Sequence, residues 1–218
     1  MATTAAPETG LATKPPPLDF ETLLREAELA HGHLCAGQIL GVRMSLLALR
    51  ELGITEPRGR DRKRLVTFVE IDRCATDAIG VVTGCRLGKR ALKLRDWGKM
   101  AATFVDLAQP LGAERYRAIR VSALESSKQR ARELYPEITD KNRQQMLGYR
   151  ELPDADLFRM AWVSVALPPG EFPGFKGERV SCGQCGEGIN YNRFTRVEGK
   201  ALCRPCAHPD DLYYQPLP

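Results

Sequence analysis

The sequence has no long apolar run and no recognisable export signal. Its 218 residues contain no stretch approaching the roughly 18 apolar residues that a membrane span needs, and the mean hydropathy is -0.31. The first 17 residues lack the basic start and apolar centre of a secretory signal. They are rich in Ala, Thr and Pro, which bury too little surface to order a chain. We therefore expect a disordered tail over 1–17, a cytoplasmic protein and no membrane partner.

Histidine is also scarce, which makes its distribution informative. Two of the three histidines lie in a single short stretch, His31-Gly-His33-Leu-Cys35. Imidazole and thiol groups bind transition metals and transfer protons. Their local concentration predicts a functional site.

Cysteine, by contrast, is plentiful. The chain has seven cysteines, an odd number that argues against a complete framework of intramolecular disulfides. In a reducing compartment, clustered cysteines indicate metal binding or redox chemistry. The net charge of +5 permits nucleic-acid binding without requiring it. The densest basic run, 58–64, is either a solvated loop or a patch that contacts phosphate.

Hydrophobic periodicity predicts an α+β core over 18–167. Apolar spacing predicts helices over 18–30 and 37–52, and Gly53 is placed to end the second helix. Residues 112–134 fit either one long helix or, as we prefer, a strand at 116–123 followed by a helix from Ser126 or Ser127. The other predicted elements are strands at 65–71, 91–95, 101–107 and 157–167 and helices at 75–83 and 140–150.

The order of these elements favours one sheet class. Helices and strands do not alternate strictly, so we expect a mixed or antiparallel sheet packed with helices. Within it, the strands at 91–95 and 101–107 are predicted to form a hairpin around Asp96-Trp-Gly-Lys99.

The composition changes after residue 167. Residues 168–180 begin with PPGEFPGFKGER, which is typical of a linker, and a separate unit is expected over 181–218. This unit contains two CxxC pairs that are 17 residues apart. Four thiolates at this spacing predict a closed structural zinc site, and zinc would supply the folding energy of so small a unit. His208 is then expected to flank a helix. The four predicted ligands are Cys182, Cys185, Cys203 and Cys206.

Three cysteines and two histidines remain for the core. Cys35 and Cys74 are each predicted at a helix start, where the helix dipole lowers a thiol pKa and favours a metal ligand or a nucleophile. Cys85 would lie about 15 Å from Cys74 if the span between them is helical, so we expect it at the cleft margin or facing a second protomer. His31 would point with His33 in an extended loop, or with Cys35 in a helix.

The stretch Thr83-Gly-Cys-Arg-Leu-Gly-Lys89 resembles a phosphate-binding loop only superficially. Its glycine spacing is one residue short, and Arg90 stands where a Walker A loop requires Ser or Thr, so we reject that interpretation. Lys89 then either holds an anion in a cleft or is a solvated surface lysine.

Several short motifs resemble those of one family. HGHLCAGQILGVRM and EIDRCATDAIGVVTGCRLGKRALKLRDWGKMAATF are similar to the HGHxCPG, DRCxxDA, GCxxGK and D-[YW]-GK segments of the FmdE-like family, which takes its name from formylmethanofuran dehydrogenase, over about 20–165. Ala36 replaces the family's usual proline. The resemblance implies an α+β core, often dimeric, and in some members a C-terminal treble-clef zinc finger. It also implies a cleft lined by His31, His33, Cys35, Asp72, Cys74, Asp77, Cys85 and Lys89.

These features support three hypotheses. The first is a metal-binding accessory protein whose His/Cys cleft binds a transition metal or a metal-containing cofactor, linked to molybdenum or tungsten enzyme metabolism. The second is a cysteine- or metal-dependent enzyme in which Cys35 is the nucleophile and His33 the base; Lys89 and Asp77 complete its catalytic set. The third is a zinc-finger regulator or scaffold. We expect a homodimer that binds a metal cofactor or small molecule, and we do not favour nucleic acid.

Overall fold

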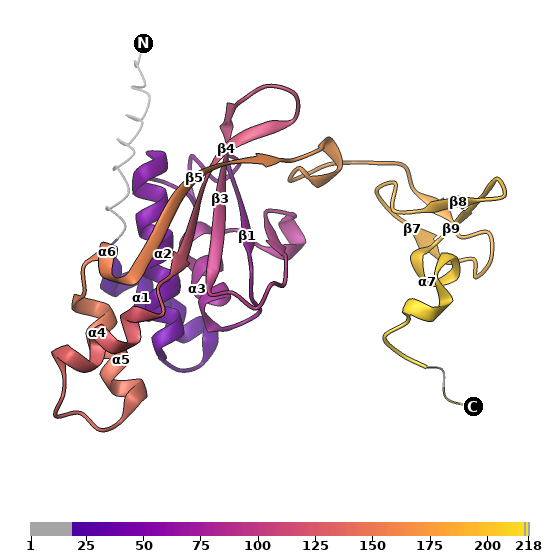
Figure 1. The fold of residues 1–218 in the computed structure, drawn as a ribbon. Coiled ribbons are helices and arrows are strands. Elements are labelled where there is room, and N and C mark those ends of the chain that lie inside the picture. Colours follow the sequence, from indigo (N-terminus) through magenta and orange to yellow (C-terminus); the bar gives the residue numbers. More distant parts are fainter. Residues whose placement is uncertain (1–18, 216, 218) are drawn as a thin grey trace, which may run out of the picture.

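The computed structural model describes residues 19–215 and 217, so the tail expected at 1–17 lies outside the described residues. Three helices, α1 (Phe20–His31), α2 (Ala36–Leu52) and α3 (Cys74–Thr83), pack beside a twisted five-stranded sheet (Figure 1). The sheet consists of β1 (Leu65–Val69), β2 (Leu92–Leu94), β3 (Ala101–Pro110), β4 (Arg115–Ala123) and β5 (Phe158–Ala166).

The strand order is β2-β1-β3-β4-β5. β1 and β2 run parallel, and the other neighbouring pairs run antiparallel. The predicted α+β class with a mixed sheet is therefore confirmed. The preferred interpretation of 112–134 also agrees with the structure, because β4 is followed by α4 (Ser126–Leu134).

The predicted hairpin between β2 and β3 is wrong, because β1 lies between these two strands. The connection around Asp96-Trp-Gly-Lys99 passes the end of β1 instead of turning tightly. The backbone N–H groups of Trp97 and Lys99 both donate to the carbonyl of Glu70, at 3.0 and 3.2 Å. This carbonyl directly follows β1, so the loop wraps around the strand end and delivers β3 to its far side.

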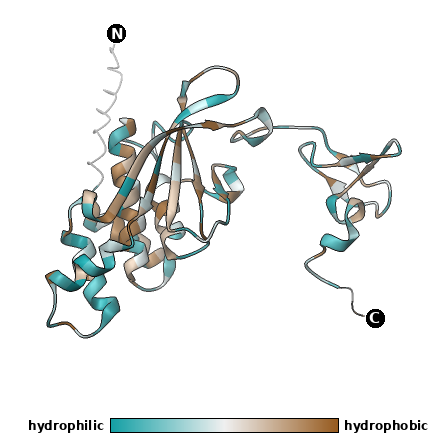
Figure 2. Cartoon of the chain, in the orientation of Figure 1, coloured by the Kyte–Doolittle hydropathy of each residue, from teal (hydrophilic) through white to brown (hydrophobic). Residues whose placement is uncertain are grey.

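Successive side chains of each strand point to opposite faces of the sheet, because the strand is pleated. Leu65, Phe104 and Ile119 belong to the main core with the three helices, whereas Val66 and Val105 belong to a second apolar cluster on the other face. Figure 2 shows hydrophobic residues concentrated in α2 and the strands, and hydrophilic residues along α4 and α5 (Lys141–Glu151). α6 (Asp154–Leu157) leads from α5 into β5.

The segment that composition predicts as a linker is partly attached to the sheet. It contains the short helix η2 (Pro169–Glu171), whose Glu171 carboxylate accepts from Lys93 Nζ at 2.7 Å. Phe172 packs edge-on against Tyr116, with 5.6 Å between ring centroids. The first residues after β5 therefore cover the sheet face opposite the helices.

The C-terminal unit is small and has its own apolar cluster (Figure 1). Two short antiparallel pairs, β6–β7 and β8–β9, precede the helix α7. Their bounds are β6 (Val180–Ser181), β7 (Gly188–Ile189), β8 (Thr195–Val197), β9 (Lys200–Leu202), α7 (Arg204–Ala207) and η3 (Pro209–Asp211). Among the described residues, no helix combines the length and apolarity needed to cross a membrane.

Candidate metal centre

Three helix ends meet at one point of the core. His31 is the last residue of α1, Cys35 is the N-cap of α2, and Cys74 is the first residue of α3. One ligand atom from each of these residues lies within 4.8 Å of the other two. All three side chains are partly exposed. The structure thus brings together a nitrogen and two sulfurs from positions up to 43 residues apart in the chain.

A glycine turn brings Cys35 back toward His31. Gly32 ends α1 with a φ of +97°, a left-handed conformation that a residue with a Cβ rarely adopts. The chain then reaches Cys35 in an extended conformation, and no hydrogen bond from its thiol caps α2. The Cys35 sulfur is therefore not used by the helix and remains available as a ligand or nucleophile.

Two glycines of α2 let α3 approach it closely. A Cβ placed on Gly37 would lie 3.2 Å from the Cys74 Cβ, and one on Gly41 would lie 2.5 Å from the Ala75 carbonyl oxygen. These glycines are four residues apart and so lie on the same helix face. Sequence reasoning missed them, although two glycines at this spacing in an apolar helix are a signal of close helix packing.

Asp77 fixes the orientation of the His31 ring. The His31 Nδ1 and Asp77 Oδ2 atoms are 2.8 Å apart. When Nδ1–H donates to this carboxylate, the lone pair of the neutral ring is on Nε2, which is the arrangement of many metal-binding histidines. The Asp77 side chain is 58% exposed and the His31 side chain 17%, so the carboxylate approaches the ring from the solvent side.

The Cys74 thiol does not behave as its helix position predicts. Its pKa is raised, first by burial and then by the neighbouring Cys35 thiol, with a further contribution from Asp77. The expectation of a lowered pKa is therefore wrong. Burial and the second thiol outweigh the backbone hydrogen bond that lowers this pKa, because a thiolate at Cys74 would lie beside another thiol and near a carboxylate.

The other predicted core residues lie outside this cluster. His33 is exposed, and its ring centroid is 4.8 Å from that of His31. Asp72 is exposed just before α3. Cys85 is buried in the apolar core, where its sulfur contacts the Thr67 hydroxyl at 3.5 Å and burial raises its pKa. The structure therefore does not bring Cys85 to the other two thiols.

Lys89 lies in a hollow of about 540 Å³ that the sequence alone does not predict. The basic run 58–64 and the stretch 83–89 are separate features of the sequence. In the structure both contribute cationic side chains to this one hollow.

The C-terminal unit brings its four cysteines together as a second group. The ligand atoms of Cys182, Cys185, Cys203 and Cys206 all lie within 4.8 Å of one another. The sulfurs of Cys185 and Cys203 are 3.8 Å apart. Two thiolates on one tetrahedral zinc ion, each bonded at about 2.3 Å, would be separated by about 3.8 Å. The spacing therefore fits a zinc ion.

Electrostatics in the C-terminal unit favour at least one thiolate. The backbone N–H groups of Cys185, Cys203 and Gln184 lower the pKa of Cys182 to about 6. The neighbouring thiols, Cys203 first, raise the pKa of Cys206 to about 12. The four thiols therefore cannot all lose their protons without a compensating positive charge. A divalent cation bound to the sulfurs supplies that charge and displaces the protons.

Comparison with known proteins identifies a family and similar proteins. The family described as "FmdE, Molybdenum formylmethanofuran dehydrogenase operon" matches residues 30–159, a range that includes the His31, Cys35 and Cys74 cluster but not the C-terminal unit. A protein of Archaeoglobus fulgidus named "Probable S-adenosyl-L-methionine-binding protein" is 32% identical over an alignment of 209 positions that covers 85% of this chain. The chain spans only 52% of the length of that relative.

A solved structure shares the fold. The FmdE-like protein of Syntrophus aciditrophicus, named after a tungsten formylmethanofuran dehydrogenase, superimposes with a TM-score of 0.58 and 22% sequence identity. The match covers 88% of this chain and 94% of the other. It therefore extends beyond the region that the family shares, into the C-terminal unit.

Proposed function

The chain belongs to the FmdE family, and on that premise we propose that it is a metal-binding accessory protein. In this proposal His31, Cys35 and Cys74 bind a transition metal, or the metal of a metal-containing cofactor. The observation that carries the proposal is the convergence of three ligand atoms within 4.8 Å at three helix ends.

The chemistry of the donors supports a particular class of metal. One imidazole and two thiols are soft or borderline ligands, which suit Zn, Cu, Ni or Fe rather than Mg or Ca. Three protein ligands leave a position free on a four-coordinate metal. A metal held in this way can accept and polarise a group of a substrate or cofactor. The partial exposure of all three side chains is consistent with such access.

The C-terminal unit has a different role in this proposal. Its four cysteines complete the shell of a tetrahedral zinc ion, so the metal would be structural. The family description and the name of the Syntrophus relative support a link of the core site to molybdenum or tungsten enzymes. The name of the Archaeoglobus relative supports a small-molecule ligand, such as S-adenosylmethionine, as an alternative occupant of the core.

A cysteine-dependent enzyme is the second candidate, and the His31–Asp77 pair favours it. A histidine oriented by a carboxylate beside a thiol is the usual arrangement of a general base and its nucleophile. This geometry favours His31 over His33 as the base for Cys35. Alkylation of Cys35 distinguishes the two candidates. In the metal-binding protein a bound metal should slow the alkylation, and removal of the metal by a chelator should restore the alkylation rate.

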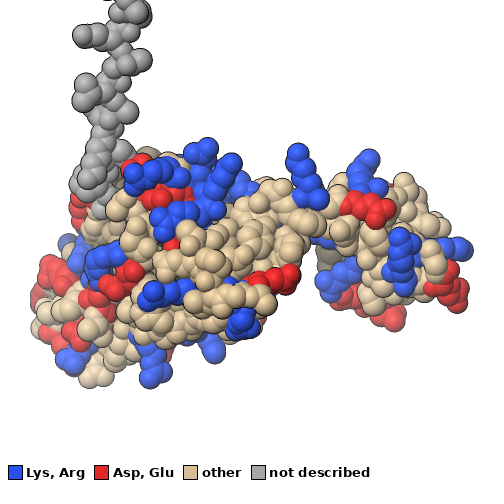
Figure 3. Space-filling model, turned by 90° about the horizontal axis from the view of Figure 1, so that it is seen from above, with Lys and Arg blue, Asp and Glu red and all other residues tan. Residues whose placement is uncertain are grey.

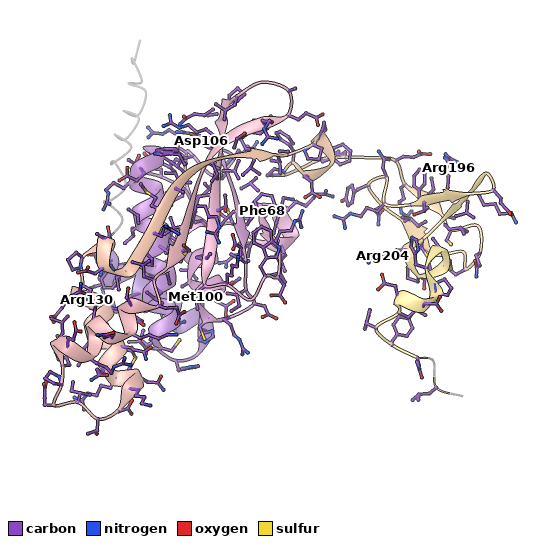
Figure 4. All side chains as sticks on the ribbon, viewed as in Figure 1. Phe68, Met100, Asp106, Arg130, Arg196 and Arg204 are labelled. Carbon is purple, nitrogen blue, oxygen red and sulfur yellow. The ribbon has the colours of Figure 1, made fainter. Side chains whose placement is uncertain are left out.

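A zinc-finger regulator has less support from the surface of the C-terminal unit. Arg196 stacks over Phe194 at 5.2 Å, and Arg204 pairs with Asp211 at 2.5 Å. Both arginines are labelled in Figure 4. On the face seen in Figure 3, basic side chains on this unit are mixed with acidic ones. These basic groups are thus partly engaged within the unit itself.

We also propose a homodimer through the edge strand β5. Met160 and Trp162 lie on this strand and are 38% and 43% exposed. An edge strand presents unpaired backbone groups to a partner, and a second copy would cover both apolar side chains. Light scattering should give twice the chain mass, and Trp162→Glu should give the single-chain mass with the fold of the chain retained. A wild-type monomer would overturn this proposal.

Cobalt substitution tests the proposed core site. Co²⁺ is a spectroscopic substitute for Zn²⁺ at sulfur-rich sites, and its thiolate charge-transfer absorption scales with the number of coordinated sulfurs. The full chain should show two classes of site, and the double variant Cys35→Ser/Cys74→Ser should lose one. Cys85→Ala is the matched control and should keep both. A single class of site in the wild-type protein would overturn the proposal.

A further inference from the structure

The hollow that contains Lys89 is a pocket separate from the proposed metal centre. Its walls come from the end of α1, the turn at 57–63, the end of α3 and the short helix η1 (Leu87–Lys89), and its volume is about 540 Å³. Ala30, which lines it, directly precedes His31, and Val81 lies one turn beyond Asp77 on α3. The size is that of a typical small-molecule site.

The charge of this pocket is strongly unbalanced. Five cationic side chains line it against one carboxylate, that of Glu26, which pairs with Arg58. Within residues 19–215, no carboxylate pairs with the other four. These four unpaired cations are Arg62, Lys63, Arg86 and Lys89. Like charges around one pocket repel one another, and a bound anion would relieve the repulsion.

Packing fixes the two cationic segments against each other. A Cβ on Gly84 would lie 3.1 Å from the Arg58 Cγ, so the turn at 57–63 rests against the end of α3. Gly84 has a φ of +70° and turns the chain toward Arg86. Arg86 and Lys89 are three residues apart around η1, a spacing at which side chains of a 3₁₀ turn project to the same side. The cations therefore converge because of the fold.

The remaining wall is apolar and suits an organic group. It is formed by Ala30, Pro57, Val81, Ala91 and Pro173. A bare inorganic anion would leave this surface uncovered, and an apolar ligand would leave the cations unpaired. A ligand with a polyanionic end and an organic end satisfies both parts of the pocket.

We propose that this pocket binds an organic diphosphate of the nucleotide type. Its phosphates would bind to Arg62, Lys63, Arg86 and Lys89, through charge-assisted hydrogen bonds. Its organic group would pack on the apolar wall. The inference does not require a metal at His31, Cys35 and Cys74, because none of these residues lines the pocket.

Calorimetric titration of the full-length protein tests the proposal. The probes are ADP, GDP, CDP and UDP, with inorganic pyrophosphate as the ligand that lacks an organic group. At least one nucleoside diphosphate should bind, and more tightly than pyrophosphate. Arg86→Ala and Lys89→Ala should each weaken this binding about tenfold or more, as expected for the loss of a charge-assisted contact.

Lys141→Ala is the matched control, because Lys141 is an exposed cation at the start of α5 and outside the pocket. It should leave the affinity unchanged. Failure of all four nucleotides to bind would overturn the proposal, as would equal weakening by Lys141→Ala and the pocket variants. An oligonucleotide that binds more tightly than every nucleotide, through the same residues, would also overturn it. The metal content of the pocket variants should equal that of the wild type, which separates this test from that of the metal centre.

Discussion

His31 and Asp77 are joined by a hydrogen bond of 2.8 Å between Nδ1 and Oδ2. This bond links the last residue of α1 to the first turn of α3. Cys74 begins the same turn of α3. One helix therefore supplies both Asp77, which orients His31, and the thiol of Cys74. The proposed metal site therefore depends on how α3 is seated against α1 and α2.

Replacing Asp77 should weaken metal binding without unfolding the protein. Asp77→Asn removes the acceptor charge that orients His31, and loss of such a partner costs about 10- to 100-fold in metal affinity. Because the Asp77 side chain is 58% exposed, the melting temperature should change little. A chelator competition titration measures the affinity of the core site. Asp72→Asn is the control, since Asp72 is exposed nearby and the carboxylate that bonds to His31 is that of Asp77. Equal affinities for the two variants would contradict the role of Asp77.

A side chain at Gly41 should disrupt the contact between α2 and α3. The added Cβ of Gly41→Ala would lie 2.5 Å from the Ala75 carbonyl oxygen and 2.9 Å from the Ala78 Cβ. Such overpacking costs about 1–3 kcal/mol, and urea unfolding should show this loss together with weaker metal binding. Gly88→Ala meets nothing within 4 Å and should be neutral. Full stability of Gly41→Ala would show that the helices can separate without cost.

Metal affinity of the core should rise with pH. Burial and the neighbouring Cys35 thiol raise the pKa of Cys74 above its ordinary value, which favours the protonated thiol in the metal-free protein. A metal must displace that proton, and its affinity should increase about tenfold per pH unit for each proton released, between about pH 6 and 8.5. Titrations at several pH values measure the slope. Cys74→Ser should reduce it and Cys85→Ala should not; a pH-independent affinity would contradict thiolate binding at Cys74.

Removing the zinc ion proposed for the C-terminal unit should unfold that unit alone. Its apolar cluster consists of four buried residues, Cys182, Ile189, Leu202 and Cys203, two of which are predicted ligands. So small a cluster cannot offset the entropy of ordering the chain without metal. Limited proteolysis after chelation should therefore cleave within 181–218 and leave the core intact. Resistance of both parts to cleavage would contradict a metal-dependent fold.

The local features of the fold could be predicted from the sequence, whereas the contacts between distant segments could not. Apolar spacing and Gly53 predict α2 correctly, because a helix is formed by contacts within a few residues. The predicted β2–β3 hairpin is wrong because β2 pairs with β1. The loop after β2 passes the end of β1, where it donates hydrogen bonds to the carbonyl of Glu70. No local pattern encodes that path.

The candidate site also combines local features with contacts between distant segments. The closeness of His31 and Cys35 comes from the turn at Gly32, and not from the helical arrangement that the sequence offers as one of two alternatives. The addition of Cys74 depends on the glycine contact between α2 and α3. The upward shift of the Cys74 pKa comes first from burial and then from the Cys35 thiol, which belongs to another helix. The cationic pocket likewise needs two segments that are some 25 residues apart in the chain.

The number of metal ions per chain tests the proposed function most directly. Elemental analysis of the full-length protein, loaded with metal and freed of excess, should give two ions per chain, one in the core and one in the C-terminal unit. Cys35→Ser/Cys74→Ser should give one ion and Cys85→Ala two. One ion in all three proteins, with that ion lost only on substitution of Cys182 or Cys203, would contradict a metal centre at His31, Cys35 and Cys74.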